Sequence, residues 1–418
     1  MTAPRRIVAL ADTDSYVKWA AALLGTLDAG WDASILVVET PLVVSDPQLD
    51  AALSGSDLPS DRVSRVGWDA LTPRLSTLGA DVVVLAGRGP LVRVLAREVA
   101  TLSPRPVIVA GLPGISIPAT RKAIAYRAQA DLFVLHSHRE CRDFAALSVE
   151  RGMPQRFALA TLPFARGGAE LSQTPKGTDL IFAPQAKVPA DRPDRMRIAR
   201  LLVRTADADP SRRVVVKLRA ERGEQQTHAE RDAYPDLLAS LGPLPPNLVT
   251  STASMHRALD RAEGLVTVSS TAAIEAIARG IPVIALDTFG VAPELINEVM
   301  ADAGLLSGEQ DVVARRFRHP DAAWLDDNYF HDAADDDWTT CTAELVAERR
   351  GGTLEPKSPL ARRGGALRDA WERKSVLGPL DRTFAGAVAM VIGMPLRFAV
   401  RVLQRLRDLV MVPRTAAR

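Results

Sequence analysis

Short runs of aliphatic residues alternate along the first half of the chain with stretches in which apolar residues recur every three or four positions. The short runs predict strands at residues 6–11, 34–38, 81–86, 106–110 and 131–135. The longer stretches predict helices at residues 17–27, 91–100 and 121–130. This alternation is typical of a parallel sheet with helices on both faces.

The alternation stops once and then starts again. Residues 162–178 are rich in Gly, Pro and small polar residues, and they predict a linker. Beyond the linker, strands are expected at residues 179–183, 213–218, 264–268 and 282–286. Helices are expected at residues 193–204, 254–261, 271–279 and 291–300. We therefore expect two α/β domains beside a cleft, at residues 1–165 and 178–345.

Composition and charge narrow the class of protein. The 418 residues are 47% hydrophobic and 24% charged, which suits a large globular core, and the net charge of +2 disfavours a dedicated nucleic-acid binder. The two cysteines form no Cys-x-x-Cys pattern, which excludes a disulfide scaffold and a thiolate zinc site. The charge is uneven, because residues 362–418 carry 12 Lys and Arg against 4 Asp and Glu.

The two ends of the chain carry expectations about location. The first ten residues lack the pattern of a signal peptide, and no apolar stretch has the length of a membrane span, so we expect a cytoplasmic protein. In the C-terminal region, residues 366–418, apolar positions from Leu396 to Val410 recur at helical spacing opposite arginines. This basic amphipathic helix either lies peripherally on an anionic surface, at the inner face of the cell membrane, or packs back on the N-terminal domain.

A candidate phosphate site follows one predicted strand of the second domain. Ser269, Ser270 and Thr271 begin the next predicted helix, where unpaired backbone N–H groups and hydroxyls suit a phosphate oxygen. An ordinary helix cap would use the same residue types.

A cationic segment follows another strand of that domain. Lys217, Arg219 and His228 suit an anionic nucleotide, or they form a solvated run of charge. The strand ends of an open α/β sheet are where ligands bind, which favours the first interpretation.

The second half of the chain resembles the C-terminal domain of GT-B glycosyltransferases, particularly bacterial sialyltransferases and capsular Kdo transferases. The resemblance rests on the Ser-Ser-Thr helix start, on Glu275 and on the strand that begins Gly280-Ile-Pro-Val-Ile. It implies a GT-B fold, with two Rossmann-like domains facing a central cleft, and a nucleotide-sugar donor bound by the second domain, Glu275 included. The His-Pro pair of these families is absent, and Lys217, Arg219 or His228 would supply the positive charge in its place.

Candidate catalytic and acceptor-binding residues follow the strands of the first domain. Asp12 and Asp14 come after the first strand, and one of them is expected to cap the next helix while the other, preferably Asp14, acts as the base. His138 is either an alternative base or a structural histidine at a strand end. The expected acceptor-binding residues lie in two loops and are Gly114, Thr120, Arg121 and His136.

The sequence thus predicts a glycosyltransferase that moves an ulosonic acid of the sialic, Kdn or Kdo type from a CMP-activated donor to a cell-surface or lipid-linked glycan. Inversion is expected if the acceptor hydroxyl displaces CMP directly. No metal and no other cofactor are expected, because a helix start and cations suffice for one phosphate. The acidic run 326–337 is interpreted as an exposed loop rather than a metal site. The alternatives are a UDP- or GDP-sugar transferase, a sugar-nucleotide epimerase, and an inactive nucleotide-sugar-binding scaffold.

Overall fold

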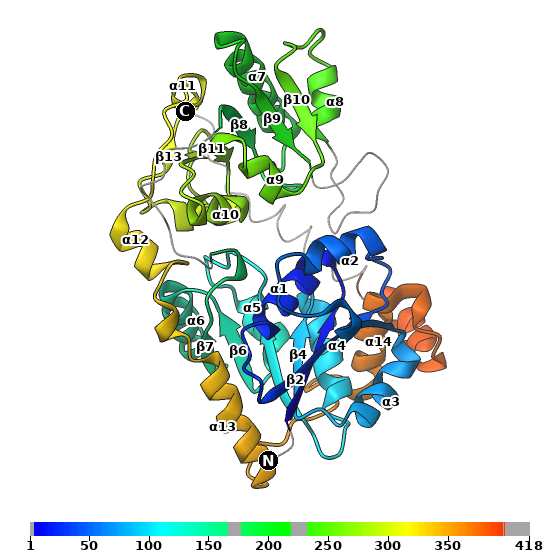
Figure 1. Ribbon diagram of the computed structural model, residues 1–418. Coiled ribbons are helices and arrows are strands. Elements are labelled where there is room, and N and C mark those ends of the chain that lie inside the picture. Colours follow the sequence, from blue (N-terminus) through cyan, green and yellow to red (C-terminus); the bar gives the residue numbers. More distant parts are fainter. Residues whose placement is uncertain (1–3, 166–176, 219–231, 396, 398–418) are drawn as a thin grey trace, which may run out of the picture.

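Two α/β domains make up most of the protein, as Figure 1 shows in a computed structural model. The structure describes residues 4–165, 177–218, 232–395 and 397. Most of the predicted linker, Arg219, His228 and nearly all of the predicted tail helix therefore lie outside the described residues. The expected two-domain α/β architecture is confirmed.

The N-terminal domain is built on a parallel sheet with the strand order β3-β2-β1-β4-β5-β6-β7. Its strands are β1 (Arg5–Ala11), β2 (Trp31–Val38), β3 (Val63–Val66), β4 (Val82–Ala86), β5 (Val107–Gly111), β6 (Leu132–Leu135) and β7 (Phe157–Leu159). The helices are α1 (Asp14–Leu24), α2 (Asp46–Leu53), α3 (Trp68–Leu78), α4 (Gly89–Val99), α5 (Arg121–Arg127) and α6 (His138–Glu150), with short 3-10 turns η1 (Ser60–Arg62) and η2 (Pro163–Ala165).

The second domain repeats this design, with the strand order β10-β9-β8-β11-β12-β13. Its strands are β8 (Asp179–Phe182), β9 (Val214–Lys217), β10 (Leu248–Ser251), β11 (Ala262–Thr267), β12 (Val283–Leu286) and β13 (Leu306–Ser307). Its helices are α7 (Arg192–Ala208), α8 (Tyr234–Ala239), α9 (Met255–Leu259), α10 (Ala272–Ala278) and α11 (Glu309–Val313).

The chain then returns to the N-terminal domain. Residues 319–337, which we call the crossover segment, contain α12 (Ala322–Asp327) and the turn η5 (Ala333–Asp335), and they lead into α13 (Trp338–Arg350). Trp338, Leu345 and Val346 are buried in the same cluster as residues of β1 and β5, so α13 belongs to the N-terminal core. The predicted end of the second domain at residue 345 is therefore too late.

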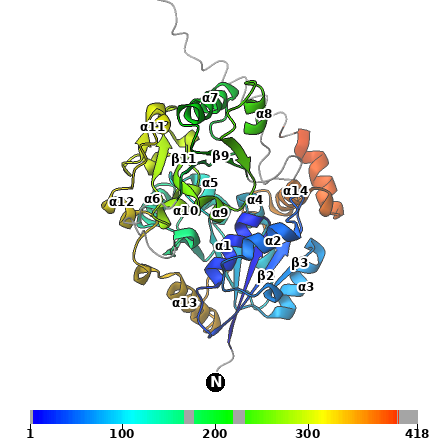
Figure 2. The same cartoon turned by 45° about the horizontal axis from the view of Figure 1, so that its top comes forward.

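The C-terminal part of the chain packs beside α4. It comprises α14 (Gly365–Leu377), the turn η6 (Gly378–Leu380) and a last described helix, Phe384–Pro395. Figure 2 shows this last helix beside α14, at the side of the N-terminal domain away from α13.

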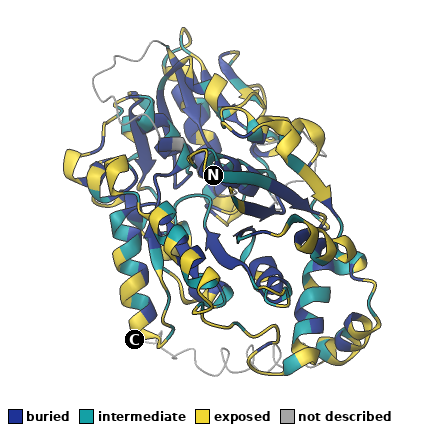
Figure 3. Ribbon diagram, turned by 60° about the horizontal axis from the view of Figure 1, so that its bottom comes forward, coloured by how far each residue is buried: buried dark blue, intermediate teal, exposed yellow. Residues whose placement is uncertain are grey.

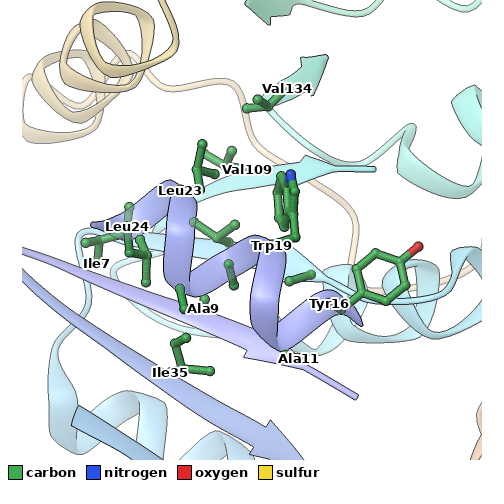
Figure 4. Close-up of a cluster of buried hydrophobic side chains, with 14 of the residues drawn as sticks. Ile7, Ala9, Ala11, Tyr16, Trp19, Leu23, Leu24, Ile35, Val109 and Val134 are labelled. Atoms are coloured by element: carbon green, nitrogen blue, oxygen red, sulfur yellow. The ribbon is translucent and has the colours of Figure 1, made fainter. Parts of the chain in front are cut away.

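Parallel strands covered on both faces explain the aliphatic runs in the sequence. Figure 3 shows the strands of both sheets largely buried, whereas the outer faces of many helices are exposed. In the N-terminal domain, α1 places Trp19 against the sheet among the side chains of Figure 4. A Cβ at Gly111 would lie 2.2 Å from the Trp19 ring, so only glycine fits at the end of β5.

One predicted helix, at residues 291–300, is wrong. Two short 3-10 turns, η3 (Pro293–Leu295) and η4 (Glu298–Met300), take its place, and Ile296 between them has a left-handed backbone. The buried side chain of Asn297 accepts from the Ala292 N–H and donates to the Gly290 carbonyl, which holds the loop in this irregular path. Side chains that bond to nearby backbone groups compete with helix formation in this way.

Candidate functional site

The candidate site lies where the carboxyl ends of the two sheets face each other. Gly114, in the loop after β5, touches the start of α10, because a Cβ on it would lie 2.8 Å from Thr271 Oγ1. Lys18 on α1 forms an ion pair of 3.5 Å with Glu275 on α10. Ile117, from the same loop as Gly114, is buried among core residues of the second domain. This junction is the place where open α/β sheets bind ligands.

Asp12 is the carboxylate that the fold buries at this junction. It follows β1 directly, has no exposed surface, and accepts a hydrogen bond of 2.8 Å from Arg88 Nε. Arg88 precedes α4, and about a third of its side chain is exposed. The loop after β4 therefore supplies the partner of Asp12.

Burial controls the charge of Asp12. Removing the carboxylate from water raises the pKa of Asp12, and the positive charge of Arg88 opposes this shift without cancelling it. Because a base is most effective with a pKa near the working pH, the raised value suits Asp12 to accept a proton.

The first turn of α1 departs from the expected capping. Thr13 occupies the N-cap and makes no side-chain hydrogen bond to the helix, so neither Asp12 nor Asp14 is the cap. Asp14 is the first helical residue and is half-buried. The expectation that one of the two acids caps the helix is therefore wrong, and of the two it is Asp12 that is enclosed at the strand end.

His136 is a buried structural residue, which contradicts its predicted role in binding acceptor. Its side chain is fully buried, and Nε2 accepts a hydrogen bond of 2.7 Å from Trp19 Nε1–H. Nδ1 must then carry the proton, which it donates to the Ala160 carbonyl at 2.7 Å. Burial lowers the pKa of His136, so the ring stays neutral and holds α1 against the ends of β6 and β7.

Glu140 connects the loops of the site, and sequence reasoning missed it. Its Oε1 accepts from Ser116 N–H at 2.9 Å and from the Tyr329 hydroxyl at 2.7 Å, while Oε2 accepts from His136 N–H at 2.9 Å. Ser137 Oγ also accepts from the Glu140 N–H. The pattern Ser-x-x-Glu at residues 137–140 was the available signal, since it marks a capping box.

His138 and the acidic run hold the crossover segment. His138 Nε2 lies 3.1 Å from Asp335 Oδ2, and Arg142 donates to both oxygens of Asp327 at 2.6 and 2.8 Å. His331 pairs with Asp336 at 3.0 Å. His138 and Arg142 thus dock the segment on α6, while Asp326, Asp335 and Asp337 are exposed, as expected for this acidic run.

No group of three or more His, Cys, Asp or Glu arranged to hold a metal ion occurs in the part of the chain that the structure describes.

The hydroxyls at the start of α10 play different roles. Ser269 is buried, and its Oγ lies within hydrogen-bond distance of Gln185 Oε1 and the Leu295 carbonyl, so it is engaged inside the domain rather than available to a donor as predicted. Ser270 Oγ accepts from Ala272 N–H at 3.2 Å and acts as a local cap. Thr271 alone of the three faces the other domain, opposite Gly114.

The remaining predicted residues take separate positions. Lys217 ends β9 and is nearly buried, and its ammonium donates to the Leu218 carbonyl. Thr120 caps α5 by accepting from Ala123 N–H at 3.2 Å, which engages the hydroxyl that was expected to bind acceptor. Arg121 follows it on the exposed start of α5.

A polar groove of about 920 Å³ lies outside this junction, between α7 and α11. Its lining carries three arginines and three acids, and all three arginines are paired, Arg197 and Arg204 with Glu309 and Arg316 with Asp311. The interdomain junction therefore remains the candidate site.

Solved structures similar to this chain share its two-domain fold. One is described as a Staphylococcus aureus MnaA–UDP co-structure (TM-score 0.52, 12% identity, 85% of this chain and 99% of the other covered). Two others are UDP-N-acetylglucosamine 2-epimerases: the Listeria monocytogenes protein, described as a putative one (TM-score 0.53, 11%, 85% and 99%), and the Methanocaldococcus jannaschii enzyme (0.53, 11%, 81% and 99%). At these identities the likeness establishes the fold alone, and that fold is GT-B.

A search of curated protein sequences finds no match. Residues 7–345 match the family described as "Putative glycosyltransferase (DUF6716)", which spans both domains and α13 up to Leu345, and the chain therefore belongs to that family.

Proposed function

We propose that the protein is a glycosyltransferase that uses a uridine-diphosphate sugar and transfers the sugar to a glycan hydroxyl. The observation that carries this proposal is the buried carboxylate of Asp12 at the junction of two Rossmann-like domains, in a chain of a glycosyltransferase family. The choice of uridine diphosphate over CMP is supported by the similar fold of proteins described with UDP or UDP-sugars.

The second domain is proposed to bind the donor. Thr271 and Glu275 lie in the first turn of α10 and face the N-terminal domain. Lys217 ends β9 in the sheet of the second domain. Lys18 reaches Glu275 from the opposite domain. Positive charge and hydroxyl groups at the edge of a domain junction suit a diphosphate, whose charge increases as the sugar leaves.

The N-terminal domain is proposed to bind the acceptor and to remove its proton. The carboxylate of Asp12 would accept the hydroxyl proton as the oxygen attacks the anomeric carbon, and the nucleoside diphosphate would depart from the opposite side with inversion. Arg88 must move for the acceptor to reach Asp12, and its partly exposed side chain allows this movement. Glu140 holds the loop of Ser116 and Gly114 that borders this space.

A nucleotide panel tests the donor. The melting temperature of the full chain is measured with UDP, CMP and GDP, because a ligand of the native state stabilises it by about 2.7 kcal/mol at a concentration of one hundred times Kd. We expect UDP to give the largest increase. Equal increases with all three nucleotides, or the largest with CMP, would overturn the assignment to uridine diphosphate.

A matched pair of variants locates the site. Thr271→Val removes the hydroxyl that faces Gly114, whereas Thr101→Val removes an exposed hydroxyl after α4. The first is expected to weaken the UDP response and the second to leave it unchanged. If the response is the same in both variants, the nucleotide does not bind at the start of α10.

A further inference from the structure

Exposed large apolar side chains concentrate in one short part of the chain. Of the twelve such side chains among the described residues, seven fall within residues 360–394. Phe384 is 84% exposed and Val391 is 75% exposed. The seven are Leu360, Leu367, Phe384, Val388, Val391, Ile392 and Met394. Scattered exposed apolar residues are ordinary, but a contiguous group marks an interaction surface.

The helix Phe384–Pro395 exposes large apolar side chains and packs small residues inward, which is the reverse of an ordinary surface helix. Its inner stripe consists mostly of small residues, with Gly386 and Ala389 buried and Gly393 so close to Trp371 that a Cβ would lie 2.3 Å from the ring. Met390 is half-buried beside Ser375 of α14, whereas the other large apolar residues of the helix are exposed. We call the exposed side chains of Phe384, Val388, Val391, Ile392 and Met394 the outer face.

The protein holds this helix on a rigid support. α14 packs on α4 through Glu372, which accepts from Arg97 at 2.7 Å and from Arg93 at 2.9 Å. Arg97 and Glu372 are buried, so the pair fixes α14 to the N-terminal domain. The outer face is thus presented by a folded structure.

This support also bears on how the helix can meet a bilayer. Among the described residues, no single helix is long and apolar enough to cross a membrane. The helices Gly365–Leu380 and Phe384–Pro395 meet that criterion only as a pair, with a bend of 111° between them. Because the first of them is tied to α4 through buried charges, the second is placed to lie along a surface.

Exposed arginines flank the helix of the outer face, since Arg382 precedes it and Arg397 follows it with its guanidinium carbon 5.7 Å from the Trp371 ring centroid. Residues 384–395 contain no charged side chain, and the following residues 396–418 contain six arginines and one aspartate. Arg362 and Arg363, before α14, are exposed. A second copy of this chain would bring two such basic regions together and be repelled, whereas anionic lipid would attract them.

We propose that the outer face docks the N-terminal domain on an anionic phospholipid surface, with the apolar side chains entering the headgroup boundary and the arginines pairing with lipid phosphates. This proposal does not depend on the identity of the sugar donor. It gives the protein a fixed side toward the membrane, the side that carries α14 (Figure 1).

Vesicle flotation of the full chain tests the proposal. The vesicles contain either equal parts of phosphatidylglycerol and phosphatidylcholine or phosphatidylcholine alone. We expect flotation with the anionic vesicles, little with the neutral ones, and release as salt increases. The variant Phe384→Ser/Val391→Ser should bind about 10- to 100-fold more weakly, because each side chain loses its transfer from water.

The control variant Val149→Ser/Leu244→Ser removes two exposed apolar side chains elsewhere. It should float like the wild type. The proposal is overturned if the wild type does not float with anionic vesicles, or if the outer-face variant floats as well as the control. It is also overturned if light scattering shows a wild-type dimer that the outer-face variant converts to a monomer, since a second copy would then cover the outer face.

Discussion

Replacing Asp12 by Asn should separate the roles of its charge in stability and in catalysis. The substitution keeps the size of the side chain and removes the charge. Asp12 is completely buried, its pKa is raised by burial, and its partner Arg88 is partly exposed and can be hydrated when the carboxylate is gone. We therefore expect the variant to be as stable as the wild type or more stable at neutral pH, because a buried charge is removed.

The pH dependence follows from the direction in which burial moves the pKa. Between the ordinary Asp pKa of 3.8 and the raised pKa, native Asp12 keeps its proton while the unfolded chain releases it. The Asp12 contribution to the free energy of unfolding is thus present below pH 3.8 and is lost as pH increases through the raised pKa. The loss amounts to about 1.4 kcal/mol for each pH unit that separates the native pKa from the unfolded one. The Asn variant lacks this loss, so its advantage over the wild type should grow from acid to neutral pH.

Urea unfolding at several pH values measures this difference, and Asp14→Asn is the matched control at the half-buried start of α1. If proton transfer uses Asp12, sugar transfer by Asp12→Asn should fall by about 10²- to 10⁴-fold. A variant that is less stable than the wild type at neutral pH would refute the argument from burial. A variant that keeps full transfer activity would refute the catalytic argument.

Three further substitutions test the packing around the site and the attachment of α14 to α4. His136→Ala should lower the free energy of unfolding by about 2–4 kcal/mol, because Trp19 Nε1–H loses its acceptor and a cavity forms. Below pH 6.5 the unfolded chain binds a proton that buried His136 does not take up, so the wild type loses stability there and the variant should not. Urea unfolding from pH 5 to 8 measures this, and the same dependence of the free energy of unfolding on pH in both proteins would contradict the prediction. Glu140→Gln should cost about 1–3 kcal/mol in the same assay, since three donors converge on the carboxylate, and a neutral effect would show that they do not depend on its charge. Glu372→Ala should cost about 3–5 kcal/mol by leaving Arg97 buried without its closest carboxylate, whereas a cost below about 1 kcal/mol would show that α14 is held by other contacts.

The fold could be predicted from the sequence because its signals are local. Buried parallel strands such as β4 consist of aliphatic residues along their whole length, and the cap residue Thr120 stands directly before its helix. The irregular loop at 291–300 was missed because it depends on the Asn297 side chain, which bonds to backbone seven residues earlier. Apolar spacing alone does not report such a bond.

The sequence predicted which residues follow the strands at the site, but not which side chains they contact. Asp12 follows β1, so its position was expected, but its partner Arg88 is 76 residues away and follows another strand. Likewise, the Tyr329 hydroxyl meets Glu140 across 189 residues. His136 has the same strand-end signal as a ligand-binding residue, and only the position of Trp19 shows that its ring is occupied.

Proton NMR of UDP-sugars incubated with the full chain and a mixture of glycan acceptors shows directly whether the protein transfers sugar from a UDP donor. We expect release of UDP together with a new glycosidic anomeric signal of inverted configuration, and both should be lost in Asp12→Asn. Conversion of the sugar nucleotide to its epimer without release of UDP would contradict the account and identify an epimerase. No change with any UDP-sugar, combined with turnover of a CMP-sugar, would contradict it in favour of the CMP-ulosonate interpretation.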